Sequence, residues 1–330
     1  MKNFLNIADH PSSLLRNIIE EAKERKLKRE GQNKSSMDKD KPLDGKSMIM
    51  IFEKPSTRTR ISFDLAIKQL GGSSMILNPD GIHYGKGDES LKDTARVLSE
   101  YADILMIRTS SHKNLEEFSK YSKIPVINGL SDQSHPCQVM SDILTFEENN
   151  GNIEGKTISW IGDGNNNMSN SFIEAAVKFK FNLKIGCPKK YSPSDKILKW
   201  ALKNKSKIFV TKDPREAAKD ADCIMTDKWV SMNDKVNKKA KKKSLKDYQV
   251  NKKLFKLAKN EISYSNFLEF IVTIYDLSDE SVLLGFLWSH PEISIGILCD
   301  SIDRLACLIS KNLVETFAHF YDLICFNANI

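Results

Sequence analysis

The strongest constraint on the fold is a regular alternation between short apolar runs and stretches with helical periodicity. Residues 47–52 (SMIMIF) form the first apolar run, and the apolar residues of 61–70 then recur at helical spacing. Buried parallel strands read as short continuous apolar runs, and consecutive parallel strands need a crossover that is usually a helix. The alternation therefore predicts an α/β fold whose parallel sheets are flanked by helices.

The alternation occurs twice along the chain, and the turn-rich stretch 148–155 separates the two series. Because 330 residues exceed the roughly 150 of one typical domain, we expect two domains, at 1–150 and 151–330. The predicted strands are 47–52, 74–77, 104–107, 125–128, 157–161, 183–186, 208–211 and 223–226. The predicted helices are 11–30, 61–70, 91–101, 114–121, 138–148, 168–179 and 214–219.

Composition narrows the setting in which the chain works. No uncharged apolar stretch approaches the ~18–20 residues that cross a bilayer, and the N-terminal residues lack the apolar core of a secretory signal. The six cysteines form no CxxC pair, so neither a zinc site nor a disulfide framework is indicated. We therefore expect a cytoplasmic protein without a membrane partner and without a metal.

The net charge of +7 is unevenly distributed, since residues 261–330 carry two basic residues against ten acidic ones. The rest of the chain is strongly basic, which suits anionic ligands such as small phosphates or nucleic acid. The most basic stretch, 235–259, holds eleven lysines and one acidic residue. Few aromatic residues interleave with these lysines, which favours a solvated loop and helix over a nucleic-acid partner.

The stretch 52–60 (FEKPSTRTR) carries the densest set of anion-binding groups. It follows a predicted strand and opens a predicted helix, whose N-terminus presents free amides and the positive end of the helix dipole. Ser56, Thr57 and Thr59 add hydroxyl donors. Arg58 and Arg60 add guanidinium groups that match phosphate oxygens. One hydroxyl would suffice as a helix cap, so the whole set predicts a phosphate site.

Two further strand ends in the first series carry candidate side chains. Arg108 follows the third predicted strand, and the carboxyl ends of parallel strands face the ligand crevice; a surface ion pair is the alternative. In HPCQ, His135 can donate to a carbonyl oxygen and the Gln138 amide can pair with an NH2 group. Cys137 has no obvious base nearby and is expected to pack as a small apolar residue.

Polar loops also follow two strands of the second series. IGDGNNNM at 161–168 combines a strand end, a tight loop and a helix start, but Asn167 stands where a dinucleotide fingerprint needs its third glycine. NAD is therefore not expected, and the asparagines are candidates for binding a polar ligand or for capping the helix. TDKWVSM at 226–232 contains Asp227, a candidate partner for a ligand ammonium or a turn cap.

Taken together, these motifs resemble the aspartate/ornithine carbamoyltransferase family. The resemblance covers about residues 1–260 and rests on the order and spacing of FEKPSTRTRISF, DQSHPCQVMSDILT, WIGDGNNN and DKWVSM. HPCQ with the later WVSM looks like the ornithine branch, which converts carbamoyl phosphate and L-ornithine to L-citrulline and phosphate, a reaction of arginine biosynthesis. The resemblance implies two α/β domains, a homotrimer or a multiple of one, and no metal or organic cofactor.

The resemblance also implies roles for individual residues of a first domain that binds carbamoyl phosphate. The phosphate would be held by Ser56, Thr57, Arg58 and Thr59. Arg108 and His135 would polarise the carbonyl oxygen and Gln138 would orient the NH2 group, so that these three and Arg58 are the expected catalytic residues. His83, in a loop reading HYGK, would reach the site of a neighbouring subunit.

A second domain would bind ornithine. Asn166 or Asn167 would contact the amino-acid end, because the loop is one residue longer than the family pattern and counting from its two ends gives different asparagines. Asp227, Ser231 and Met232 would complete this pocket.

The resemblance stops near residue 260, where the composition also changes. The ornithine branch carries a His-Cys-Leu-Pro string after the next strand and later an arginine that reaches the carbamoyl carbonyl, and 261–330 has neither in the expected context. Two interpretations stay open, a frame-shifted tail and a divergent tail with altered or lost activity. The alternatives to ornithine as acceptor are another amine, such as putrescine, or no acceptor at all in a non-catalytic trimer that binds phosphate.

Overall fold

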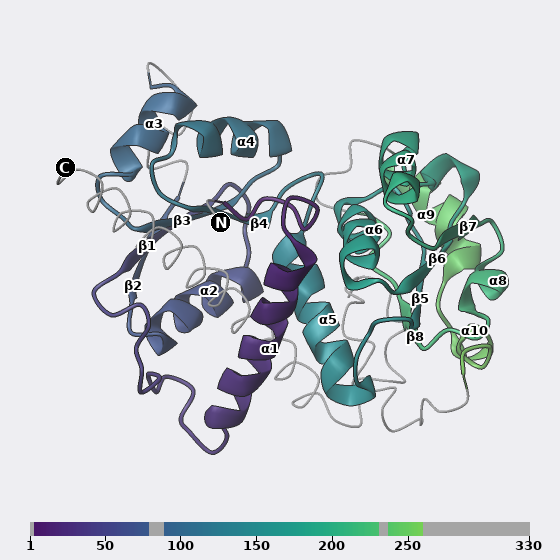
Figure 1. The fold of residues 1–330 in the computed structure, drawn as a ribbon. Helices are drawn as coiled ribbons and strands as arrows, with labels where there is room; N and C mark the ends of the chain where they lie inside the picture. The colour runs from purple at the N-terminus through teal and green to yellow at the C-terminus, as the bar shows by residue number, and fades with distance from the viewer. Residues whose placement is uncertain (1–2, 79–88, 231–236, 260–330) are drawn as a thin grey trace. The chain divides into compact units, whose positions relative to one another are not determined.

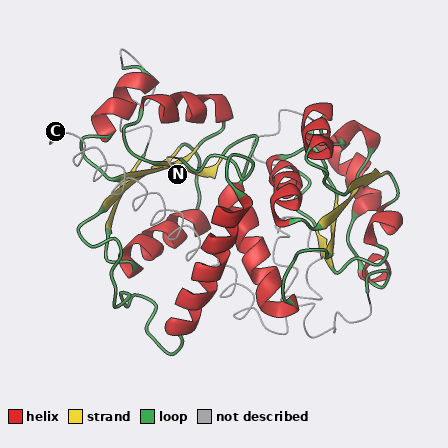
Figure 2. Ribbon diagram, viewed as in Figure 1, coloured by secondary structure: helices red, strands yellow, loops and turns green. Residues whose placement is uncertain are grey.

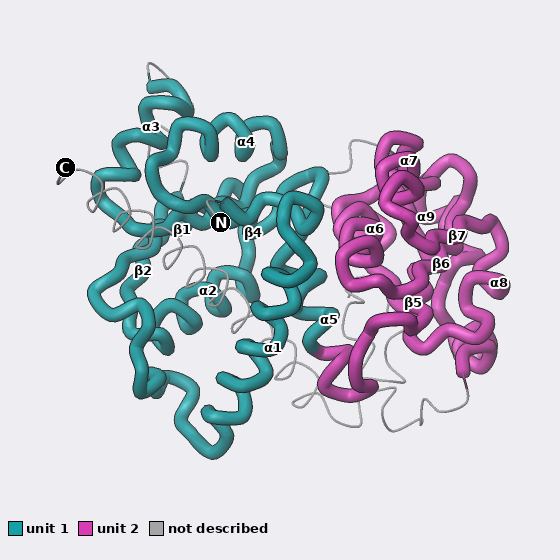
Figure 3. The backbone as a smooth tube through the Cα atoms, in the orientation of Figure 1, with its two compact units in different colours: residues 1–144, 299–330 teal, residues 145–298 magenta. Residues whose placement is uncertain are grey.

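A computed structural model describes residues 3–78, 89–230 and 237–259 (Figure 1). The chain divides into two compact units, residues 1–144 with 299–330 and residues 145–298 (Figure 3). His83, Ser231, Met232 and the atypical tail 261–330 lie outside the described residues.

The first unit is built on a parallel sheet whose described part has four strands in the order β2-β1-β3-β4. The strands are β1 (Ser47–Phe52), β2 (Ser73–Leu77), β3 (Ile104–Arg108) and β4 (Val126–Leu130). The helices are α1 (Ser12–Lys28), α2 (Arg58–Gln69), α3 (Leu91–Leu98), α4 (His112–Tyr121) and α5 (Pro136–Asn150). Figure 1 shows α3 and α4 on one face of the sheet and α1 and α2 on the other.

Both faces of the central strands are buried, which explains why they read as unbroken apolar runs. Because successive strand side chains point to opposite faces, Ile49 and Ile51 pack with Leu115 and Phe118 of α4. Met50, between the two isoleucines, is fully buried on the opposite side of the strand. This two-sided core holds the ends of β1 and β3 in fixed positions.

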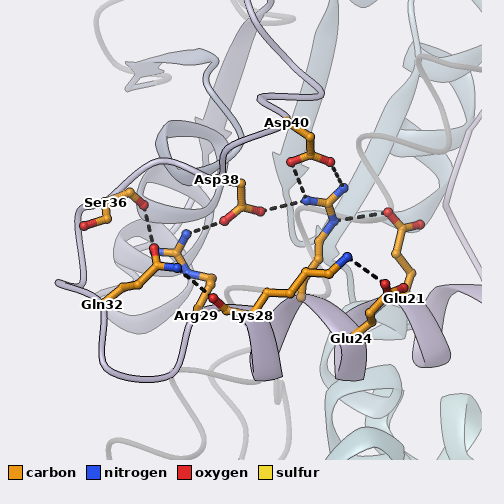
Figure 4. Close-up of polar contacts among 9 residues, drawn as sticks. Glu21, Glu24, Lys28, Arg29, Gln32, Ser36, Asp38 and Asp40 are labelled. Atoms are coloured by element: carbon orange, nitrogen blue, oxygen red, sulfur yellow. Dashed lines mark hydrogen bonds and ion pairs between the residues drawn. The ribbon is translucent and has the colours of Figure 1, made fainter.

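A network of arginines and carboxylates fixes the polar loop that follows α1 (Figure 4). Arg25 donates to Asp38 at 2.7 Å and to Asp40 at 2.8 Å. Arg29 donates to Asp38 as well, and to the carbonyl oxygen of Ser36 at 2.8 Å. Asp38 therefore ties Arg25 in the last turn of α1, and Arg29 just after the helix, to a segment without regular structure.

The second unit repeats the architecture, with four described parallel strands in the order β7-β6-β5-β8. The strands are β5 (Thr157–Ile161), β6 (Asn182–Gly186), β7 (Ile208–Thr211) and β8 (Cys223–Met225). The helices are α6 (Asn167–Phe179), α7 (Asp195–Lys203), α8 (Pro214–Ala218), α9 (Lys238–Leu245) and α10 (Lys252–Phe255), with short 3-10 turns at Lys189–Tyr191 and Lys246–Tyr248.

Two parallel sheets with flanking helices confirm the predicted fold class (Figure 2). The sequence prediction misses α7, although Ser194 caps its start by accepting from the Ile197 amide at 3.5 Å. The signal that could have found it is the helical spacing of Ile197, Trp200 and Ala201 in DKILKWALK. The structure also starts α2 at Arg58, before the first apolar residue of the predicted helix.

Candidate active site

The candidate site of the first unit lies at the carboxyl ends of β1 and β3. These neighbouring strands end side by side, with Phe52 paired to Arg108. From β1 the sheet continues to β2 on one side, and from β3 it continues to β4 on the other. Such a topological switch point leaves a crevice outside the strand ends, where open α/β sheets bind ligands. The register between β3 and β4 shifts here, because Ile107 pairs with Asn128 and Arg108 with Leu130, which leaves Gly129 as an extra residue in β4.

The first turn of α2 faces this crevice without the usual side-chain cap. Thr57 occupies the N-cap position but its hydroxyl makes no capping hydrogen bond, and the first turn contains no acidic residue. The amides and the positive dipole end of α2 therefore keep their capacity to bind an anion. Ser56 is partly exposed, Thr57 and Arg58 are exposed, and Thr59 is buried.

Arg108 and Arg58 concentrate positive charge beside this helix end. Arg108 is 8% exposed and donates from Nη1 to Thr59 Oγ1 at 3.1 Å. Among the described residues its buried Nε has no hydrogen-bond partner. Burial, with the nearby charge of Arg58, lowers the pKa of Arg108 to about 10, so the group stays cationic at neutral pH. These two cations, together with the unsatisfied Nε donor of Arg108, favour an anionic ligand.

His135 immediately precedes α5 and lies within the electrostatic reach of Arg108. Burial of the ring, followed by the charge of Arg108, lowers its pKa to about 3. The imidazole is therefore neutral at pH 7 and can donate one hydrogen bond without carrying a charge.

A compact turn positions His135. The Ser131 amide donates to the Ser134 carbonyl oxygen at 2.9 Å, and the Ser134 amide donates to Ser131 Oγ at 3.1 Å. His112 Nδ1 lies 2.7 Å from Ser131 Oγ and links the turn to the start of α4. The turn therefore fixes where α5 begins.

Gln138 lies in the first turn of α5, three residues after His135. Its Nε2 donates to Asp142 Oδ1 at 2.9 Å, which fixes the plane of the amide. Cys137 is buried between them and its thiol donates to the Asn128 carbonyl oxygen at 3.4 Å. Burial raises the pKa of this thiol, so Cys137 packs as the expected small apolar residue.

The candidate site of the second unit lies at the carboxyl ends of β5 and β8, which are again neighbours at a switch point. The loop after β5 begins at Gly162, whose φ of +134° lies in the region that favours glycine. At Gly164, a Cβ would come within 2.9 Å of Cys187 Sγ and of the Tyr191 carbonyl oxygen. The loop therefore passes too close to its neighbours for any larger residue at Gly164.

The two candidate asparagines differ in their surroundings. Asn166 is the N-cap of α6 and its Oδ1 accepts from the Ser169 amide at 2.8 Å. Asn167 is buried and its Oδ1 accepts from the Met168 amide at 3.0 Å. Helix capping, one of the two predicted uses of these residues, is thus observed for Asn166.

Asp227 follows β8 and faces the loop after β5. Its Oδ1 accepts from the Lys228 amide at 2.7 Å. Burial raises the pKa of this carboxyl to about 6, an effect to which the negative charge of Asp163 adds, while Lys228 and Lys241 oppose it. A partly buried carboxylate with this pKa gains from an incoming ammonium.

Asp163 and Lys241 form a contact that the sequence analysis did not anticipate. Lys241 Nζ lies 2.6 Å from Asp163 Oδ2, and both side chains are 4% exposed. Lys241 belongs to the lysine-rich stretch read from sequence as solvated. The helical spacing of Lys241 and Leu245, both buried on α9, is the signal that marks this lysine as inward-facing.

The described residues contain no group of three or more His, Cys, Asp or Glu side chains placed to hold a metal ion. In the same part of the chain, no helix combines the length and the apolarity needed to span a bilayer.

Comparisons with known proteins find relatives along most of the chain. A family model described as the carbamoyl-P binding domain of aspartate/ornithine carbamoyltransferase matches residues 2–148, and one described as the Asp/Orn binding domain matches 154–264. A Rhodopseudomonas palustris protein named ornithine carbamoyltransferase is 46% identical over 267 residues, 81% of this chain and 84% of that protein. A Brucella ovis protein of the same name is 46% identical over 232 residues, 70% of this chain and 72% of that protein.

Solved structures give the same result. The structure of ornithine carbamoyltransferase from Pyrococcus furiosus matches with a TM-score of 0.78 and 34% identity, covering 94% of this chain and 95% of that one. That of anabolic ornithine carbamoyltransferase from Campylobacter jejuni matches with a TM-score of 0.78 and 32% identity, covering 100% and 99%.

Proposed function

The chain belongs to the aspartate/ornithine carbamoyltransferase family, as its motifs predicted, and on this premise we propose that it transfers the carbamoyl group of carbamoyl phosphate to L-ornithine. The observation that carries the proposal is the uncapped start of α2 beside Arg58 and Arg108, where cationic groups and free amides gather without an acidic residue in the helix's first turn. This arrangement suits the phosphate of carbamoyl phosphate.

In the proposed reaction, the neutral δ-amine of ornithine attacks the carbamoyl carbon. Negative charge builds on the carbonyl oxygen, the bond from carbon to the bridging phosphate oxygen then breaks, and the amine loses a proton as citrulline forms. Ser56, Thr57, Arg58 and Thr59 would hold the phosphate, which leaves as the free anion. Fixed donors aimed at the oxygens that gain charge are the main source of rate enhancement in such a step.

Arg108 and His135 would stabilise the charge on the carbonyl oxygen. Arg108 brings a buried cation with an unsatisfied Nε, and His135 brings a neutral N–H donor at neutral pH. Gln138, whose amide plane is fixed by Asp142, would receive the carbamoyl NH2 on its carbonyl oxygen. These roles assign the activation of carbamoyl phosphate to the first unit.

The acceptor would bind in the second unit. Asp227, with its raised pKa, would receive the ammonium at the amino-acid end of ornithine. Asn167 or Asn166 would bind the same end, and we assign Ser231 and Met232 to the remainder of this pocket. Asn166 already caps α6, which favours Asn167 as the ligand contact.

We further propose a cytoplasmic homotrimer that serves arginine biosynthesis, with His83 of one subunit completing the site of the next. Exposed apolar side chains support contact between copies, since Met75 on β2 is 60% exposed and Tyr101, which follows α3, is 75% exposed. Light scattering after gel filtration should give three times the chain mass of 37.5 kDa; a monomer would contradict the assembly.

Citrulline formation from carbamoyl phosphate and ornithine by the purified chain tests the activity. Losing one oxyanion donor typically costs about 2.7–4 kcal/mol of barrier, so Arg108→Met should lower kcat by about 100- to 1000-fold. Arg215→Met, which removes an arginine whose side chain is 76% exposed, should leave kcat unchanged. Equal rates in both variants would refute the role of Arg108.

A second candidate function is carbamoyl phosphate binding without transfer. The observation that favours it is the absence of His-Cys-Leu-Pro after residue 260, since the match to the second family model ends at 264. Saturable binding of carbamoyl phosphate without any citrulline formation would support this alternative. Binding together with carbamoylation of putrescine would instead indicate a different acceptor amine.

A further inference from the structure

One lysine of the lysine-rich helix α9 is buried, unlike the other lysines of that helix. Lys241 is 3% exposed, whereas its neighbour Lys243 is exposed on the same helix. Lys241 and Leu245 lie four residues apart and form the inner face of α9, so a cation occupies a position where an amphipathic helix normally buries an apolar side chain.

The buried ammonium makes two contacts inside the second unit. It pairs with Asp163 Oδ2 at 2.6 Å, and it lies 5.5 Å from the centre of the Tyr191 ring. Asp163 in turn is fixed by its backbone, since Oδ1 accepts from the Asn165 amide at 2.9 Å and the Asp163 carbonyl oxygen accepts from Trp160 Nε1 at 2.9 Å. The ion pair is thus part of the loop that leads into α6.

This loop and Asp227 are placed together by strand pairing. β5 pairs with β8 through Trp160 and Met225. Asp163 and Asp227 each lie two residues beyond the end of their strand, so both lie at the same edge of the sheet. Two carboxyl groups at one edge repel each other, and Lys241 lies against one of them.

We propose that Lys241 is a positioning residue for the acceptor amine: by neutralising Asp163 it keeps Asp227 a carboxylate that can receive the ammonium of an amino-acid substrate. This inference rests on the proposed function for the identity of the substrate. Among the described residues, the charged groups that act on Asp227 are Lys228, Asp163 and Lys241, and Lys241 is the one whose removal would leave Asp163 buried without its cation.

The test compares Lys241→Met with Lys243→Met, which makes the same substitution at an exposed position of the same helix. With Lys241 removed, the pKa of Asp227 should rise above about 6, so less carboxylate is present at neutral pH. The ratio of the variant's ornithine KM to that of the wild type should be about tenfold at pH 7 and fall to within about twofold at pH 9. Lys243→Met should give a ratio near one throughout.

Two further variants keep the test decisive. Lys241→Arg retains the charge and should restore the wild-type pH profile, and Asp163→Asn combined with Lys241→Met removes both charges and should restore most of it. A KM ratio for Lys241→Met that does not change with pH, or a loss confined to kcat, would overturn the inference in favour of a purely structural lysine.

A turnover-free measurement separates this inference from the proposed function. The carboxyl carbon of Asp227, identified by its absence in Asp227→Asn, can be titrated by 13C NMR in the wild type and in Lys241→Met. A higher pKa in the variant supports the inference even if the chain forms no citrulline, and an unchanged pKa refutes it even if the chain is active.

Discussion

Replacing Arg58 with methionine should weaken ligand binding while changing the stability of the ligand-free protein only slightly. Arg58 and Arg108 repel each other, and this repulsion adds to the larger effect of burial in lowering the pKa of Arg108. Because Arg58 is exposed and its charge is screened, relief of this repulsion should raise the free energy of unfolding by only about 0.5–1 kcal/mol. Methionine has a helix propensity close to that of arginine, so α2 itself should be unaffected.

The same substitution removes the proposed guanidinium contact to phosphate. Hydrogen bonds to charged groups contribute about 1.5–3 kcal/mol, which corresponds to a rise in the Kd for carbamoyl phosphate of about 10- to 150-fold. Calorimetric titration measures this Kd, and urea unfolding of the ligand-free protein measures stability.

Lys68→Met is the matched control, since it removes a cation from the other end of α2. Lys68 pairs with Asp64 at 2.8 Å on an exposed surface, so its loss should cost about 0.3–0.5 kcal/mol and leave the Kd unchanged. An Arg58→Met protein that binds carbamoyl phosphate normally, or that loses stability together with affinity, would refute the reasoning by showing that Arg58 serves the fold.

Other consequences of the structure can be measured directly. Asp38→Asn should lower the free energy of unfolding by about 2–4 kcal/mol in urea, because it weakens the contacts with Arg25 and Arg29 at once; a change under 0.5 kcal/mol would contradict this. Gly164→Ala should cost about 1–3 kcal/mol and raise the ornithine KM, while the Kd for carbamoyl phosphate stays constant. The pKa of His135 is depressed to about 3 in the folded protein, so its contribution to stability should be lost as pH falls from about 6.5 toward 3, and His135→Gln should flatten that slope. Asp227 has a folded pKa raised to about 6, so stability should fall as pH rises from about 4 to 6, and a slope that persists in Asp227→Asn would contradict the assignment.

Much of the fold was predictable because its signals are local. Buried parallel strands such as 47–52 need apolar residues on both faces, so they appear in the sequence as continuous apolar runs. Helix α7 could also have been predicted, since Ile197, Trp200 and Ala201 recur at helical spacing within it. Strand order was not predicted at all, since it depends on pairings such as that of β5 with β8 that bring distant segments together.

Some features of the candidate site can likewise be predicted from the sequence, and others require the structure. The donors around α2 are contiguous in sequence, so their chemistry could be recognised from residue types alone. The charge that Arg58 exerts on Arg108 required the structure, because it depends on two strands ending side by side. Lys241 was read as one solvated lysine among eleven, since composition does not distinguish the inward-facing position on α9 from the outward ones.

The most direct test of the central claim is to mix the purified chain with 13C-carbamoyl phosphate and ornithine and follow the labelled carbon by NMR. The account predicts that the label moves to citrulline as phosphate appears, at a rate that falls by at least about 100-fold in Arg108→Met. Label that remains in carbamoyl phosphate beyond its spontaneous breakdown, with no citrulline signal in the wild type, would contradict it.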